Sequence, residues 1–145
     1  MEWAEVVDNP LLKDLPFKIE LNKWGNILMS PASNNHGIRQ YEMVKLLQQK
    51  NSGQIIIECS IQTNEGVRVA DVAWASDAFM SEHGDDTPYT AAPEICIEVL
   101  SPSNSIEEMN EKIRLYLEKG ALEIWLCGKN GEISYYDANG LVDCD

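Results

Sequence analysis

The sequence predicts a mixed α/β fold, with a central β-sheet flanked by helices. Strand-length runs of β-branched and apolar residues alternate along the chain with two longer segments of helical periodicity. The run at 94–100 is apolar on both of its faces, which is typical of a strand covered on both sides of a sheet. The chain has 145 residues, 44% of them apolar, so it is long enough for a buried core, and we expect one domain over residues 1–145.

The first half of the chain is predicted to hold a lead-in and two strand pairs separated by a helix. Turn signals at Asp8-Asn9-Pro10 favour an irregular lead-in over residues 1–16. Apolar residues at three-to-four spacing indicate the helix, and Asn51-Ser52-Gly53 is typical of its end. The predicted elements are strands at 17–21 and 27–29, a helix at 36–50, and a hairpin of strands at 54–61 and 67–75.

The second half is predicted to begin with a mobile surface connection over residues 76–92, because this stretch is polar and charged. The next helix starts at Ser103 or Ser105, and Ser105 with Glu108 forms a capping-box pattern. The remaining predicted elements are a strand at 94–100, a helix ending at 119, strands at 123–127 and 132–136, and a short polar tail from residue 137.

Composition disfavours several classes of function. A net charge of −13 argues against broad, non-specific binding of phosphates, but not against a locally basic groove or a metal site. The four cysteines are spaced singly, which disfavours a local zinc site and favours reduced, inert thiols. No apolar run approaches the roughly 20 residues of a membrane span, and no signal-peptide pattern is present, so we expect a cytoplasmic protein.

Two carboxylates, Asp71 and Glu98, are predicted to lie on apolar strands. By strict alternation Glu98 shares a face with Cys96 and Leu100, whereas Ala70 and Val72 share the face opposite Asp71. A buried carboxylate needs a partner, and two of them can bind Mg²⁺, which keeps several waters and needs only one or two carboxylates. The alternatives are a carboxylate bonded to a turn for Asp71 and a structural ion pair, for instance with Lys112, for Glu98.

Lys112, Tyr116 and His36 complete the candidate site. Lys112 follows the Glu98 strand and lies one turn before Tyr116, so it could orient a water molecule or offset phosphate charge. His36 opens the earlier helix and could contact the substrate phosphate or a second metal-bound water. Taken alone, a lysine such as Lys112 is more often a solvated helix lysine, and a histidine such as His36 is more often an N-terminal helix residue without a chemical role.

Several of these segments together resemble a known family. The segments are R-V-A-D-V-A-W, A-P-E-I-C-I-E-V-L-S-P-S-N-S, E-K-I-R-L-Y-L-E-K-G and A-L-E-I-W-L, with I-L-M-S-P-A-S-N-N-H-G before the first helix. They are similar to the Uma-two family of putative restriction endonucleases, from about residue 17 to 136. The resemblance implies the PD-(D/E)XK nuclease superfamily, with a restriction-endonuclease-like fold and Mg²⁺-dependent (or Mn²⁺-dependent) cleavage of DNA.

The resemblance also implies roles for individual residues. Asp71 matches the aspartate of the PD motif, with Ala70 in place of the proline, and Glu98 matches the acidic residue of (D/E)XK. Leu100 stands where that motif has its lysine, and Lys112, with Tyr116 four residues later, is the substitute we expect. The family implies a DNA-cutting homodimer, while the acidic charge and the missing lysine favour the alternative, a catalytically inactive binding or assembly module of the same fold.

Overall fold

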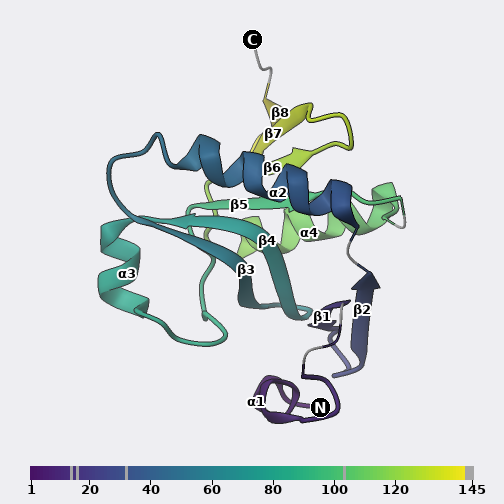
Figure 1. Ribbon diagram of the computed structural model, residues 1–145. Helices are drawn as coiled ribbons and strands as arrows, with labels where there is room; N and C mark the ends of the chain where they lie inside the picture. Colours follow the sequence, from purple (N-terminus) through teal and green to yellow (C-terminus); the bar gives the residue numbers. More distant parts are fainter. Residues whose placement is uncertain (14, 16, 32, 103, 143–145) are drawn as a thin grey trace.

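A six-stranded mixed sheet with helices on both faces forms the centre of the molecule (Figure 1), which confirms the predicted fold class. The computed structural model describes residues 1–142 except 14, 16, 32 and 103. The strand order is β3-β4-β5-β6-β7-β8; the β5–β6 pair is parallel, and the other neighbours are antiparallel. Strands β1 and β2 form a separate antiparallel sheet. The elements are α1 (Trp3–Asp8), β1 (Phe17–Leu21), β2 (Ile27–Pro31), α2 (Asn34–Leu47), β3 (Gln54–Thr63), β4 (Gly66–Ala75), α3 (Asp77–His83), β5 (Ile95–Val99), α4 (Ile106–Glu118), β6 (Glu123–Cys127), β7 (Ile133–Asp137) and β8 (Gly140–Val142).

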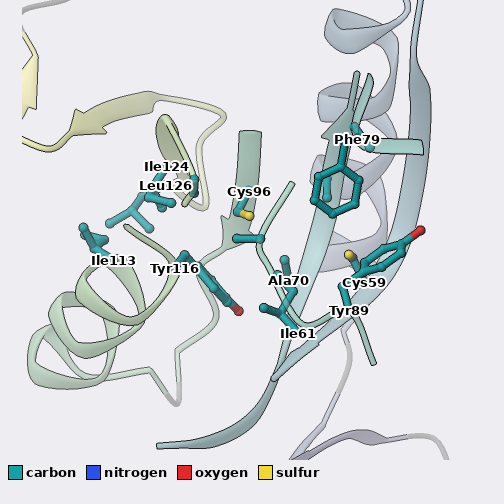
Figure 2. Packing of buried hydrophobic residues seen from close by; sticks show 14 of the residues in the cluster. Cys59, Ile61, Ala70, Phe79, Tyr89, Cys96, Ile113, Tyr116, Ile124 and Leu126 are labelled. Carbon is teal, nitrogen blue, oxygen red and sulfur yellow. The ribbon is translucent and has the colours of Figure 1, made fainter. Parts of the chain in front are cut away.

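The central strand β5 is buried on both faces, as its sequence predicts. Ile95, Ile97 and Val99 pack in one cluster with Met43 and Leu47 of α2. On the opposite face, Cys96 belongs to one cluster with Met109, Ile113 and Tyr116 of α4, and Figure 2 shows Ile113 and Tyr116 extending from this helix into the cluster. Period-two alternation therefore divides β5 between two helices, and Glu98 falls on the α4 side with Cys96.

The two long helices begin at serine caps. The Ser33 hydroxyl accepts a hydrogen bond from the His36 amide at 3.1 Å, and the Ser105 hydroxyl accepts one from the Glu108 amide at the same distance. Of the two predicted starts of α4, Ser105 is correct, whereas Ser103 lies outside the described residues. Since the first cap fixes the start of α2, it also places His36 in the first turn of that helix.

Three predicted irregular segments contain regular structure. The lead-in holds α1, whose Val6 packs in a cluster with Leu21 of β1 and Val67 of β4. The stretch at 76–92 holds α3, with Phe79 and Tyr89 in the core, and the tail includes β8. These elements are too short to show periodicity, and it is their burial and pairing that stabilise them.

The structure describes three of the four cysteines. Cys59, Cys96 and Cys127 are buried and free, and burial raises the pKa of Cys59 to about 12. Cys144 lies outside the described residues. No helix in the described part of the chain is long and apolar enough to cross a membrane.

Candidate functional site

The candidate site lies where β4 and β5 separate. The paired residues of β4 and β5 end at Val72 and Ile97. Asp71 and Glu98 follow directly after this last pair and are no longer paired with each other. Pairing of β3 with β4 is also interrupted opposite Asp71, at Glu58, whose φ is 55°. Asp71 is therefore paired with neither β3 nor β5, the two neighbours of β4.

This irregularity overturns one prediction for β4. Ala70 packs in the cluster on the α4 side, whereas Val72 packs in the cluster on the α2 side. Strict alternation would place these two residues on the same face. The alternation changes phase at Asp71 because regular pairing stops there, and the period-two rule holds only along a regular ladder.

Side chains satisfy the backbone groups that the separation of the strands leaves free. The amide of Val99 donates to Asp71 Oδ2, and the amide of Val69 donates to Glu20 Oε2, each at 2.7 Å. The carbonyl of Val69 accepts from Lys18 Nζ at 3.0 Å. Buried backbone groups of this kind require partners, so the site residues are also part of the fold.

Lys18 lies between the two predicted carboxylates. Its Nζ is 3.0 Å from Asp71 Oδ1 and 3.1 Å from Glu98 Oε1, and its side chain is 14% exposed. Lys18 and Glu20 come from β1, where residues two apart point to the same side of the strand. The β1–β2 hairpin, which lies outside the central sheet (Figure 1), thus contributes a cation and a carboxylate to the site.

Two residues of α4 contact the carboxylate of Glu98. Lys112 Nζ is 3.1 Å from Glu98 Oε1 and 2.7 Å from Glu20 Oε2. The Tyr116 hydroxyl donates to Glu98 Oε2 at 2.9 Å. Both α4 residues are buried, because they lie on the helix face that packs on the sheet.

Two residues of α2 contact Asp71. His36 Nε2 lies 3.2 Å from Asp71 Oδ2, and Gln40 donates from Nε2 to the Asp71 backbone carbonyl at 2.9 Å. Their spacing of four residues places them on the same face of the helix.

The structure brings all five predicted residues together: Asp71, Glu98, Lys112, Tyr116 and His36. It places Lys112 in contact with Glu98 but gives it no described contact with Asp71. Sequence reasoning missed Lys18, Glu20 and Gln40. The alternation in F-K-I-E-L does place Lys18 and Glu20 on one strand face, but only the docking of the hairpin against β4 turns that face toward the site.

The local charges shift several pKa values. Burial would raise the pKa of Asp71, but the charge of Lys18 and the hydrogen bond with His36 hold it well below its usual range. Burial raises the pKa of Glu98, and the charges of Lys112 and Lys18 offset this rise only in part. Burial would lower the pKa of Lys18, but Glu98 and Asp71 outweigh it, so this pKa is raised and Lys18 is a cation at neutral pH.

The site opens into a cleft of about 860 Å³ that is lined by the β1–β2 hairpin, α2 and α4. Carboxylates outnumber cations on its walls, and this excess is unfavourable for an anionic ligand. The cations are Lys18, Arg68 and Lys112, and the carboxylates are Glu20, Glu58, Asp71, Glu98, Glu108 and Glu111.

The oxygens around Lys18 fit a hard divalent cation. Asp71 Oδ1, Glu98 Oε1 and the Val69 carbonyl all lie 3.0–3.1 Å from one ammonium nitrogen, so they converge on a single cation position. Carboxylate and carbonyl oxygens are the ligands that Mg²⁺ takes in proteins, completed by water. Among the described residues, no three His, Cys, Asp or Glu side chains are grouped as a metal site, so the protein ligands would be these two carboxylates and backbone oxygen.

The fold is that of a known group of structures. It is similar to the crystal structure of a putative nuclease belonging to DUF820 from Anabaena variabilis, with a TM-score of 0.64 and 19% sequence identity. The match covers 88% of this chain and 81% of that chain, and at this identity it concerns the fold alone.

The chain belongs to the Uma2 family, described as putative restriction endonucleases, whose family model matches residues 10–141. This confirms the resemblance that the sequence motifs indicate. No curated protein sequence matches the chain.

Proposed function

We propose that this chain is a Mg²⁺-dependent endonuclease that hydrolyses phosphodiester bonds of DNA. The observation that carries the proposal is the convergence of Asp71 Oδ1, Glu98 Oε1 and the Val69 carbonyl on one cation position at the floor of an open cleft. Membership of a restriction-endonuclease family supports nuclease activity and DNA as the substrate. Cutting both strands of a duplex takes two such sites, which supports a homodimer as the working unit.

A divalent ion held by Asp71 and Glu98 supplies Lewis-acid stabilisation of the charge on the scissile phosphate. The protein aims one oxygen of each carboxylate at that position. Asp71 Oδ2 is fixed by the Val99 amide and by His36, which leaves Oδ1 for the cation. Glu98 Oε2 is fixed by Tyr116, and Oε1, which Lys112 also contacts, faces the cation position. We assign Asp71 and Glu98 as the metal ligands.

Lys112 acts on this site through Glu98. Its side chain is only 6% exposed and lies between Glu20 and Glu98, so its contacts orient Glu98. We therefore assign Lys112, Tyr116 and His36 as positioning residues of the carboxylates. Lys18 also lines the cleft, where it contacts both carboxylates.

Plasmid nicking tests the proposal. Wild type is expected to nick plasmid DNA with Mg²⁺ or Mn²⁺ and to be inactive in EDTA. Asp71→Asn and Glu98→Gln remove the charge of a metal ligand and are expected to reduce the rate at least about 100-fold, since even residues that support metal ligands contribute about 10–100-fold. Glu107→Gln, on an exposed residue of the first turn of α4, is the matched control and is expected to retain full activity.

The same experiment separates the proposal from a catalytically inactive binding module. One observation favours the module: Leu100 holds the motif's lysine position, and its side chain packs against the core cluster on the α4 side. DNA binding without nicking in any divalent metal would identify the module. Nicking that persists in both carboxylate variants would show that the cleavage comes from elsewhere.

A further inference from the structure

The ammonium group of Lys18 donates hydrogen bonds to three oxygens of the site. A lysine ammonium has three N–H donors and no acceptor. The three acceptors around Lys18 Nζ are the Val69 carbonyl at 3.0 Å, Asp71 Oδ1 at 3.0 Å and Glu98 Oε1 at 3.1 Å. The protein therefore coordinates this ammonium with the same oxygens that the proposed function assigns to a divalent ion.

Two cations cannot share this position. The oxygens that hold Lys18 are the ones a metal would need, and at such separations two positive charges in a partly buried site repel strongly. Without Lys18, conversely, Asp71 and Glu98 would lie beside each other with less compensation of their charge. The lysine thus stabilises the metal-free site and competes with a metal for it.

Lys18 has a path out of the site. It enters from β1, whose hairpin forms one wall of the cleft, and the cleft of about 860 Å³ offers space for its flexible side chain. Lys112 is different, because it is held by Glu20 at 2.7 Å as well as by Glu98 and is more deeply buried. Rotation of the Lys18 side chain alone can free the cation position.

We propose that Lys18 is an internal cation that occupies the divalent-metal position of the free protein and is displaced into the cleft when a metal binds. The displaced ammonium then faces the cleft, where it offsets part of the acidic charge that opposes a phosphate. This inference rests on the proposed function, because it takes the metal position to be that of the nuclease.

Amine labelling of the wild-type protein tests the displacement. The protein is treated with an acetylating reagent in EDTA and in Mg²⁺, at ionic strength matched with KCl, and labelling of each lysine is followed by peptide mass spectrometry. If the free protein releases Lys18 in about a tenth of molecules or fewer, Mg²⁺ is expected to speed its labelling by about tenfold or more. Lys112 is the internal control expected to stay protected, and the exposed Lys23 should be labelled in both conditions.

Calorimetry with Mn²⁺ supplies a second measurement. Lys18→Met removes the competing charge, so its Mn²⁺ affinity is expected to exceed that of wild type by about tenfold or more. Lys23→Met is the control expected to bind as wild type does. If Lys18→Met does not fold, the labelling experiment decides alone.

The outcomes distinguish the two proposals. Mg²⁺ binding to wild type with unchanged labelling of Lys18, or with no gain of affinity in a folded Lys18→Met, overturns the displacement and leaves the nuclease proposal standing. Absence of any Mg²⁺ or Mn²⁺ binding overturns both.

Discussion

At the scale of single residues, each carboxylate divides its oxygens between the fold and the site. Asp71 Oδ2 accepts from the Val99 amide, and Oδ1 accepts from Lys18. Glu98 Oε2 accepts from Tyr116, and Oε1 accepts from Lys18 and Lys112. This division fixes the orientation of both groups before any ligand arrives, and such preorganisation is what makes a polar site effective.

His36 gives this site a dependence on pH. The hydrogen bond with Asp71 raises the pKa of His36 above its ordinary value, against the effect of burial. A group whose pKa is higher in the folded state stabilises the fold fully below its unfolded pKa of about 6.5. That contribution is lost as the pH rises through the folded-state pKa.

We therefore expect His36→Gln to destabilise the metal-free protein more at pH 5.5 than at pH 9. The measurement is urea unfolding of both proteins in EDTA at several pH values. His83→Gln is the control, because His83 contacts Glu82 in a different part of the fold and this substitution leaves the contact between His36 and Asp71 in place. A destabilisation by His36→Gln that stays constant or grows with pH would contradict the assignment.

At the scale of elements, the sequence predicts the parts that have long or regular patterns. It places β5 and its two faces correctly, and it places Lys112 on α4 one turn before Tyr116, whereas the burial of Lys112 is seen only in the structure. It does not predict α3, a helix of seven residues that depends on a Ser76 cap bonded to Glu94 and on burial of Phe79. Such tertiary support leaves no periodic trace in a short segment.

The site residues that the sequence did not predict also depend on tertiary packing. Lys18, Glu20 and Gln40 lie on elements that were predicted, but which of their faces meets β4 is decided by docking. The change of phase at Asp71 likewise follows from the separation of β4 from β5. Sequence patterns report the regular part of a strand, whereas the site is built at its irregular point.

The docking of the β1–β2 hairpin can be tested at Gly66. This glycine has a φ of 94°, and a Cβ there would collide with the Leu21 carbonyl and with Asn22, at the end of β1. Gly66→Ala is expected to move the hairpin that carries Lys18 and Glu20. Gly140 is a matched control, because its φ of 105° is also left-handed but a Cβ added there would meet no atom within 4 Å.

Both alanine variants should lose about 1–2 kcal/mol from the unfavourable φ. Gly66→Ala should lose about 1–3 kcal/mol more from overpacking. Urea unfolding measures the difference. Equal destabilisation by the two substitutions would show that the β1–β2 hairpin does not pack closely against Gly66.

At the scale of the whole molecule, charge opposes the proposed substrate. The net charge is −13, and carboxylates outnumber cations in the cleft itself. Juxtaposed like charges cost several kcal/mol, so binding of the proposed phosphate substrate would require an added cation.

DNA affinity should therefore depend on a divalent ion. In fluorescence anisotropy with labelled duplex DNA, replacing EDTA by Ca²⁺ at matched ionic strength is expected to increase affinity by about tenfold or more. The Asp71→Asn/Glu98→Gln double variant controls for effects of Ca²⁺ on DNA, and it should lose most of this dependence. Equal affinity in EDTA and Ca²⁺ for wild type would show that the cleft carboxylates do not face the DNA.

The bonds from Asp71 and Glu20 to the backbone amides of Val99 and Val69 also shape how such a sequence evolves. Selection for a stable fold is enough to retain both acids, so a lineage that stopped cutting DNA would continue to inherit them. Relaxed selection on cleavage would first change residues that reach the cleft without bonding the sheet backbone, such as His36, whose ion-pair partner is a side chain. If the proposed cleavage is correct, substitutions at such positions are expected to mark the relatives that have lost it.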